Sequence, residues 1–137
     1  MGSVSENTLE VYTDGNLIFS STGKWLHPLF ELEDFLASSA YEHARLLVKD
    51  KITGKAAAML LVRLGVLRVK AGILSELGRS VFDRHAVRYE YGKLVPRILC
   101  QTEHLLEGID DLENAYALIA ARAGRSKAPS ARQVSPD

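Results

Sequence analysis

Two short apolar patterns near the start of the chain predict a β-hairpin. Residues 9–13 alternate apolar and polar side chains, and residues 17–20 form a second short run of the same kind. Both patterns are typical of half-buried strands. The Asp14-Gly15-Asn16 segment between them is a strong hairpin signal, because glycine accepts the positive φ of a tight turn. We therefore expect two antiparallel neighbouring strands.

Helical spacing replaces alternation further along the chain. Leu29, Leu32 and Leu36 share one helix face, and Pro28 suits the first turn of a helix that ends at about Leu36. A second segment, residues 56–64, is apolar on nearly every face, and Gly65 suits its end. A helix that is apolar all round is buried, so this segment predicts a central helix.

Strand patterns flank the predicted helices in the second half of the chain. Short runs at residues 45–49, 66–69 and 87–91 read as strands, and Ser75 is placed to cap a helix that runs to about His85. Strand–helix–strand order at these lengths indicates right-handed parallel crossovers. A final helix is expected to begin at Asp110 or Asp111. The order of elements predicts a three-layer α/β/α domain with a mixed sheet of about five strands.

Length and composition fit one globular domain. The chain has 137 residues, 47% of them hydrophobic and 25% charged, which is enough for a single core. We expect this domain to span residues 8–123, with residues 1–7 and 124–137 as flexible tails. The oligomeric state is left open, and a homo-oligomer is compatible with the sequence.

Charge and cysteine content narrow the compartment and the partners. The formal net charge is zero, which argues against nucleic acid as the main partner. The N-terminus has no basic start followed by an apolar run, and the most apolar stretch, residues 56–62, is too short to cross a bilayer. Cys100 is the only cysteine, so an intramolecular disulfide is impossible. A cytoplasmic protein without a membrane partner is expected.

Two copies of one tripeptide mark candidate ligand-binding turns. Thr22-Gly23-Lys24 follows the second predicted strand and Thr53-Gly54-Lys55 follows the third. Open α/β sheets bind ligands where strands lead into helices, and helix N-termini present free N–H groups to anions. A lysine at such a terminus opposes the helix dipole, and a bound anion would relieve that conflict. The alternative is that the lysines extend into solvent and Asp50 pairs with one of them.

Other motifs give weaker indications. Neither turn is a phosphate loop of nucleotide hydrolases, because Lys49 stands where that motif needs glycine and Ala56 stands where it needs serine or threonine. Cys100 and His104 would share one helix face, which suits an activated nucleophile, although a lone cysteine is more often a small buried hydrophobe. These residues do not supply three metal ligands, so no metal and no cofactor is expected.

Three stretches resemble a small family of uncharacterised proteins classed as deaminases with the cytidine deaminase-like fold. The resemblance covers roughly residues 8–120 and rests on Gly23-Lys24-Trp25-Leu26-His27-Pro28-Leu29-Phe30-Glu31-Leu32, Asp50-Lys51-Ile52-Thr53-Gly54-Lys55-Ala56-Ala57-Ala58 and Val95-Pro96-Arg97-Ile98-Leu99-Cys100. It implies that the starts of the first two helices face each other and form the site.

The resemblance does not extend to the zinc motifs. Zinc deaminases need His-x-Glu at the first helix and Pro-Cys-x-x-Cys at the second. This chain has His27-Pro28-Leu29 at the first position and Asp50-Lys51 without a cysteine at the second. Zinc-dependent deamination is therefore not expected.

The sequence thus predicts a metal-independent site for a small anionic or nucleotide-like ligand at the starts of the first two helices. Its expected catalytic residues are Asp50, Lys51 and Cys100, and its expected ligand-binding residues are Gly23, Lys24, Trp25, His27, Thr53, Gly54 and Lys55. One alternative is a non-catalytic binding or regulatory module on a deaminase-like scaffold. A third hypothesis makes Cys100 a covalent carrier.

Overall fold

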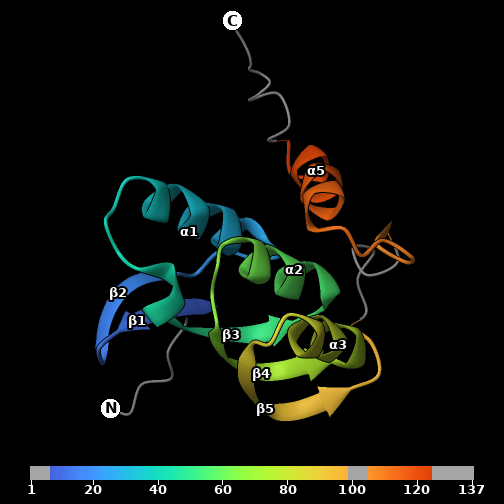
Figure 1. The fold of residues 1–137 in the computed structure, drawn as a ribbon, viewed down its shortest axis with the longest axis horizontal. Coiled ribbons are helices and arrows are strands. Elements are labelled where there is room, and N and C mark those ends of the chain that lie inside the picture. The colour runs from blue at the N-terminus through green and yellow to red at the C-terminus, as the bar shows by residue number, and fades with distance from the viewer. Residues whose placement is uncertain (1–6, 99–104, 125–137) are drawn as a thin grey trace, which may run out of the picture.

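The computed structural model describes residues 7–98 and 105–124 of the chain (Figure 1). The strands of the described part are β1 (Leu9–Thr13), β2 (Asn16–Ser21), β3 (Leu47–Thr53), β4 (Arg68–Ser75) and β5 (Arg88–Val95). Its helices are α1 (His27–Ala37), the short 3₁₀ helix η1 (His43–Arg45), α2 (Lys55–Arg63), α3 (Glu76–Arg84) and α5 (Leu112–Arg122).

The five strands form one mixed sheet in the order β2-β1-β3-β4-β5. β1 runs antiparallel to both β2 and β3, whereas β3, β4 and β5 are mutually parallel. At the hairpin between β1 and β2, Asp14 and Gly15 have φ values of 51° and 81°, as a tight primed turn requires. The predicted α/β fold with a five-stranded mixed sheet in three layers is confirmed.

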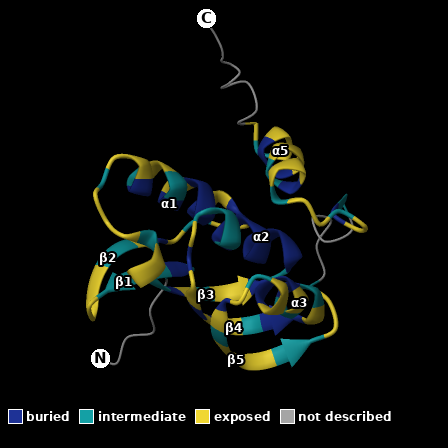
Figure 2. Ribbon diagram, in the orientation of Figure 1, coloured by how far each residue is buried: buried dark blue, intermediate teal, exposed yellow. Residues whose placement is uncertain are grey.

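The layers follow one another as sheet, α1–α3 and α5. Each crossover moves in the same direction along the sheet, so right-handed connections place α1, α2 and α3 on the same face (Figure 1). α5 packs on α2 from the side away from the sheet. Residues 55–61 of α2 are consequently buried all round (Figure 2). The described helices leave the second face of the sheet open. Along β4, exposed Arg68 and Lys70 belong to this open face, and the residues between them, such as Val69, are buried against the helices.

The predicted strands in the second half are found, with different bounds. β3 was expected at residues 45–49 and ends at Thr53, while β4 and β5 also run four or more residues beyond their predicted ends. The added part of β3 contains Asp50 and Lys51, which a hydrophobic pattern does not assign to a strand. It pairs with β4 in a regular parallel register, so backbone hydrogen bonding outweighs the polar composition.

Several predicted helix boundaries are confirmed by side-chain or backbone geometry. The Ser75 hydroxyl accepts a hydrogen bond from the Gly78 N–H at 3.0 Å, and the Asp111 carboxylate accepts one from the Asn114 N–H at 2.8 Å. Gly65 ends α2 with a φ of 87°. No helix in the described ranges is both long enough and apolar enough to cross a membrane.

Candidate functional site

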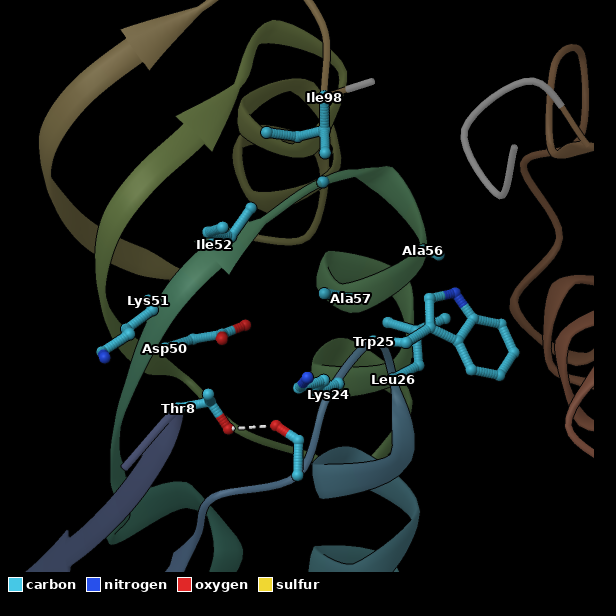
Figure 3. A pocket seen from close by; sticks show the side chains of 12 residues that line it. Thr8, Lys24, Trp25, Leu26, Asp50, Lys51, Ile52, Ala56, Ala57 and Ile98 are labelled. Carbon is cyan, nitrogen blue, oxygen red and sulfur yellow. Dashed lines mark hydrogen bonds between the residues drawn. The ribbon is translucent and has the colours of Figure 1, made fainter. Parts of the chain in front are cut away.

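A cavity of about 320 Å³ lies where β3 leads into α2, beside the start of α1 (Figure 3). Both Thr-Gly-Lys turns reach it: Gly23 and Lys24 belong to the first turn and Gly54 to the second. The cavity is here named the Asp50 pocket, and it is lined by Thr8, Gly23, Lys24, Trp25, Leu26, Asp50, Lys51, Ile52, Gly54, Ala56, Ala57 and Ile98. The fold thus brings together segments that are some thirty residues apart in the sequence.

Hydrogen bonds to the backbone of Gly23 fix the first turn. The Thr8 hydroxyl donates to the Gly23 carbonyl oxygen at 2.7 Å (Figure 3). The Gly23 N–H donates to Ser21 Oγ at 3.0 Å. Ser21 in turn donates to the Glu31 carboxylate on α1. Because both polar groups of Gly23 are engaged, the turn is held against the start of β1 and the start of α1.

Asp50 is the carboxyl side chain that points into the pocket (Figure 3). Its Oδ2 accepts a hydrogen bond from the Thr53 hydroxyl at 3.0 Å. Burial raises the pKa of Asp50 to about 7, and the hydrogen bonds from Thr53 and from the Ile52 backbone offset only part of that shift. A carboxyl group that titrates near neutral pH can both accept and donate a proton.

Lys51 does not share the pocket interior with Asp50. Neighbouring residues of a strand point to opposite faces, and the Lys51 side chain extends away from the pocket (Figure 3). Its backbone N–H donates to the Thr8 carbonyl oxygen at 3.1 Å, which closes the sheet between β3 and the start of β1. The expected acid–base pair is therefore split between the two faces of the sheet.

Trp25 stands at the mouth of the pocket in an unusual backbone conformation. Its φ is 59°, in the left-handed region that costs a non-glycine residue on the order of 1 kcal/mol. The side chain is 40% exposed, and its ring lies edge-on to His27 with centroids 5.2 Å apart. A large exposed ring held in a strained conformation beside a cavity is a candidate for contact with a ligand. His27 itself is exposed and outside the pocket lining.

The structure places Lys55 differently from the sequence expectation of an anion binder. The side chain is buried, and Nζ donates to the Leu106 carbonyl oxygen at 2.8 Å and lies 3.5 Å from Asp110 Oδ1. The Lys55 ammonium, followed by Arg84 at 3.2 Å, lowers the pKa of Asp110. Lys55 therefore ties α2 to the segment before α5 and lies outside the pocket lining.

Two predicted residues remain. Thr53 supports the pocket from behind its lining, and Cys100 is not among the residues that the structure describes. Thr53 is fully buried, and its hydroxyl positions the Asp50 carboxyl. Cys100 lies outside the described residues, so the structure gives it no place. Within residues 7–98 and 105–124, no three His, Cys, Asp or Glu side chains gather as a possible metal site.

Sequence reasoning missed Thr8, Leu26, Ile52, Ala56, Ala57 and Ile98 in the pocket lining. Ile52 carried a usable signal in the sequence, since it is an apolar residue next to a charged stretch; in the structure it is 53% exposed. Thr8 and Ile98 come from segments before β1 and after β5, and only the folded sheet brings them to the pocket.

Comparison with known proteins places the chain in a family. Residues 5–122 match the model of the TM1506 domain of unknown function, DUF1893. The crystal structure of a DUF1893 family protein, TM1506 from Thermotoga maritima, is 27% identical and superposes with a TM-score of 0.75, covering 85% of this chain and 81% of that one. No curated protein matches the sequence. Neither match is described as a deaminase, so a deaminase relationship is not shown. The chain belongs to the TM1506 family, a domain of unknown function (DUF1893).

Proposed function

We propose that the Asp50 pocket binds a small anionic or nucleotide-like molecule and that the Asp50 carboxyl exchanges a proton with it. The observation that carries this proposal is geometric. A single carboxyl side chain points into a largely apolar cavity of about 320 Å³ at a strand-to-helix junction (Figure 3). Apolar pockets with a few convergent polar groups at such junctions are the usual small-molecule sites of α/β folds.

The lining suggests how such a ligand would lie. Ile52, Ala56, Ala57 and Ile98 offer apolar contact to a flat ring, and Trp25 at the mouth can stack on it. Positive charge beside the pocket comes from Lys24 and from the N-terminal N–H groups of α2, and it favours a ligand that carries negative charge. Asp50 faces N–H or O–H groups.

A deaminase-like hydrolysis is the reaction that the sequence resemblance implies for this site. Asp50 would take a proton from water as its oxygen bonds to the ring carbon, and would return that proton to the amine as the carbon–nitrogen bond breaks and ammonia leaves. The zinc motifs of deaminases are absent from this sequence, so proton transfer falls to Asp50.

A non-catalytic binding module is the second candidate, and the position of Lys51 favours it. Because the Lys51 side chain leaves the pocket, Asp50 is the one carboxyl side chain among the described lining residues, and its expected lysine partner is absent from the interior. A single carboxyl can recognise a donor group without transforming the ligand.

Thermal unfolding in the presence of nucleosides, nucleoside monophosphates and inorganic phosphate tests binding, and ammonia release from aminated nucleosides tests turnover. We expect at least one nucleoside or nucleotide to raise the melting temperature by mass action. Asp50→Asn should abolish turnover and weaken binding, whereas Asp34→Asn, which removes an exposed carboxyl on α1, should change neither. Binding without ammonia release would favour the binding module. If no compound in the panel binds, the proposed function is wrong.

A further inference from the structure

A second hollow lies on the open face of the sheet and adjoins the Asp50 pocket. It measures about 300 Å³ and shares Thr8, Asp50 and Lys51 with the pocket lining. Lys49 and Lys70 complete its basic side, and Glu10 adds a second carboxylate beside Asp50, so three lysines and two acids line one depression. The two cavities meet where the β1–β3 ladder ends, at the hydrogen bond between the Lys51 N–H and the Thr8 carbonyl oxygen.

The sheet register sets two of these lysines side by side. Lys49 on β3 is the direct partner of Lys70 on β4, and Lys51 lies two residues along β3 on the same face. Like charges that face each other across a strand pair are destabilising. The arrangement is therefore one that a bound anion would stabilise.

The carboxylate opposite Lys49 in the register is hydrogen-bonded to other side chains. Glu10 is the register partner of Lys49 on the other side, but its two oxygens accept from the Asn7 amide and the Tyr12 hydroxyl, each at 2.9 Å. The Lys49 ammonium lies over the Tyr12 ring instead, 4.8 Å from its centroid.

Lys70 shows the same lack of an acidic partner. Its register partner on β5 is Glu90, yet within the described ranges neither Lys49 nor Lys70 forms an ion pair with a carboxylate. Among the described residues, a ligand anion would therefore not have to displace a carboxylate from either ammonium group.

A glycine keeps the floor of the hollow bare. A Cβ atom at Gly72 would lie 2.7 Å from the Lys51 carbonyl oxygen, so the close approach of β3 and β4 admits no side chain there. The space beside Lys51 and Lys70 therefore results from the backbone of Gly72, which has no side chain that could fill it.

We propose that this hollow is an anion subsite that holds the phosphate end of the ligand whose ring occupies the Asp50 pocket. This inference rests on the proposed function and specifies its ligand as a molecule with a ring and a phosphate or diphosphate group. The sequence suggested Lys24 and Lys55 as the anion-binding pair, but Lys55 is bound to the Leu106 carbonyl oxygen and to Asp110. In this proposal the three lysines of the hollow bind the phosphate instead. The ligand passes around the end of the β1–β3 ladder at Thr8.

Titration of the ¹⁵N-labelled full chain with sodium pyrophosphate at constant ionic strength tests the subsite alone. We expect saturable binding, with the largest amide shifts at residues 49–51 and 70–72. The Lys49→Gln/Lys70→Gln variant should lose affinity by about tenfold or more. The matched control, Arg88→Gln/Lys93→Gln on the exposed part of β5, removes the same charge and should bind like the unmodified protein. Circular dichroism confirms that both variants are folded.

Three results would overturn the subsite: no saturable binding, shifts centred on residues 23–26, or an equal loss of affinity in both variants. A parallel titration with a nucleoside, which lacks phosphate, reports on the pocket separately. If the nucleoside binds near Asp50 and pyrophosphate does not bind, the subsite is wrong and the proposed function stands. If pyrophosphate binds at the lysines and no nucleoside binds, the anion site stands without the function proposed for the pocket.

Discussion

At the first Thr-Gly-Lys turn, Lys24 is exposed beside the Asp50 pocket, whereas at the second turn Lys55 is buried and donates to the Leu106 carbonyl oxygen at 2.8 Å. The same tripeptide thus supplies a surface cation in one place and an internal tie in the other. The residues that follow differ in the same way, since Trp25 adopts a left-handed conformation and Ala56 is already helical.

The difference follows from the helix that each turn introduces. α1 buries one face and leaves the other in solvent, so a side chain at its entrance reaches water. α2 is enclosed by the sheet, its neighbouring helices and α5, so an ammonium group at its start must find oxygen partners inside the protein. Burial of the following helix, and not the turn sequence, decides what the lysine does.

The largest expected effect is a difference in the free energy of unfolding between variants of Lys55 and of Lys24. Lys55→Met leaves the buried Leu106 carbonyl without its donor, and we expect it to lower the free energy of unfolding by about 2 to 3 kcal/mol. Lys24→Met should leave that free energy unchanged within error. Urea unfolding followed by circular dichroism measures both. Equal effects of the two variants would mean that the turns do not differ as described.

The next effect concerns Asp50, which is hydrogen-bonded to Thr53 of the second turn. Its pKa of about 7 lies above the ordinary value of 3.8, so between these pH values the folded protein binds more protons than the unfolded chain. The free energy of unfolding should therefore fall as the pH rises from about 4 to about 7. The full shift corresponds to a penalty of about 4 kcal/mol at pH 8. Because Asp50 is only partly buried, we expect Asp50→Asn to be more stable than the unmodified protein by about half of that, about 2 kcal/mol, at pH 8, but not at pH 4. A stability difference that does not vary with pH would contradict the assignment.

The smallest effect compares the residues that follow the two lysines. At position 25 the left-handed backbone should make Trp25→Gly more stable than Trp25→Ala by about 1 kcal/mol. At position 56 the order reverses, and Ala56→Gly should cost about 0.5 to 1 kcal/mol because the residue is helical. Thermal unfolding of the three variants measures both differences. The same sign at both positions would show that the two turns have equivalent backbones.

Local signals in the sequence predicted much of the fold. Asp14-Gly15 fixed the hairpin, Ser75 and Asp111 marked helix starts, and the all-round apolar pattern identified α2 as central. The later half of β3 was missed because its outer face meets solvent. The charged residues of this segment do not give a hydrophobic strand pattern, and its strand conformation is evident only from its pairing with β4.

The candidate site was only partly predictable. Gly23, Lys24 and Asp50 follow from their positions at strand-to-helix junctions, and the pocket contains all three. The partner of Lys55 was not predictable, because Leu106 is 51 residues away along the chain. The hollow beneath Lys49 and Lys70 required the register of two strands, which hydrophobic patterns do not supply.

Direct titration of the Asp50 carboxyl tests the central claim that this pocket holds a group able to exchange protons near neutral pH. The ¹³Cγ chemical shift of Asp50, followed by NMR from acid to alkaline pH and assigned with Asp50→Asn, gives its pKa in the folded protein. The account predicts a midpoint of about 7. A midpoint near about 4, the value of a solvated aspartate, would contradict it.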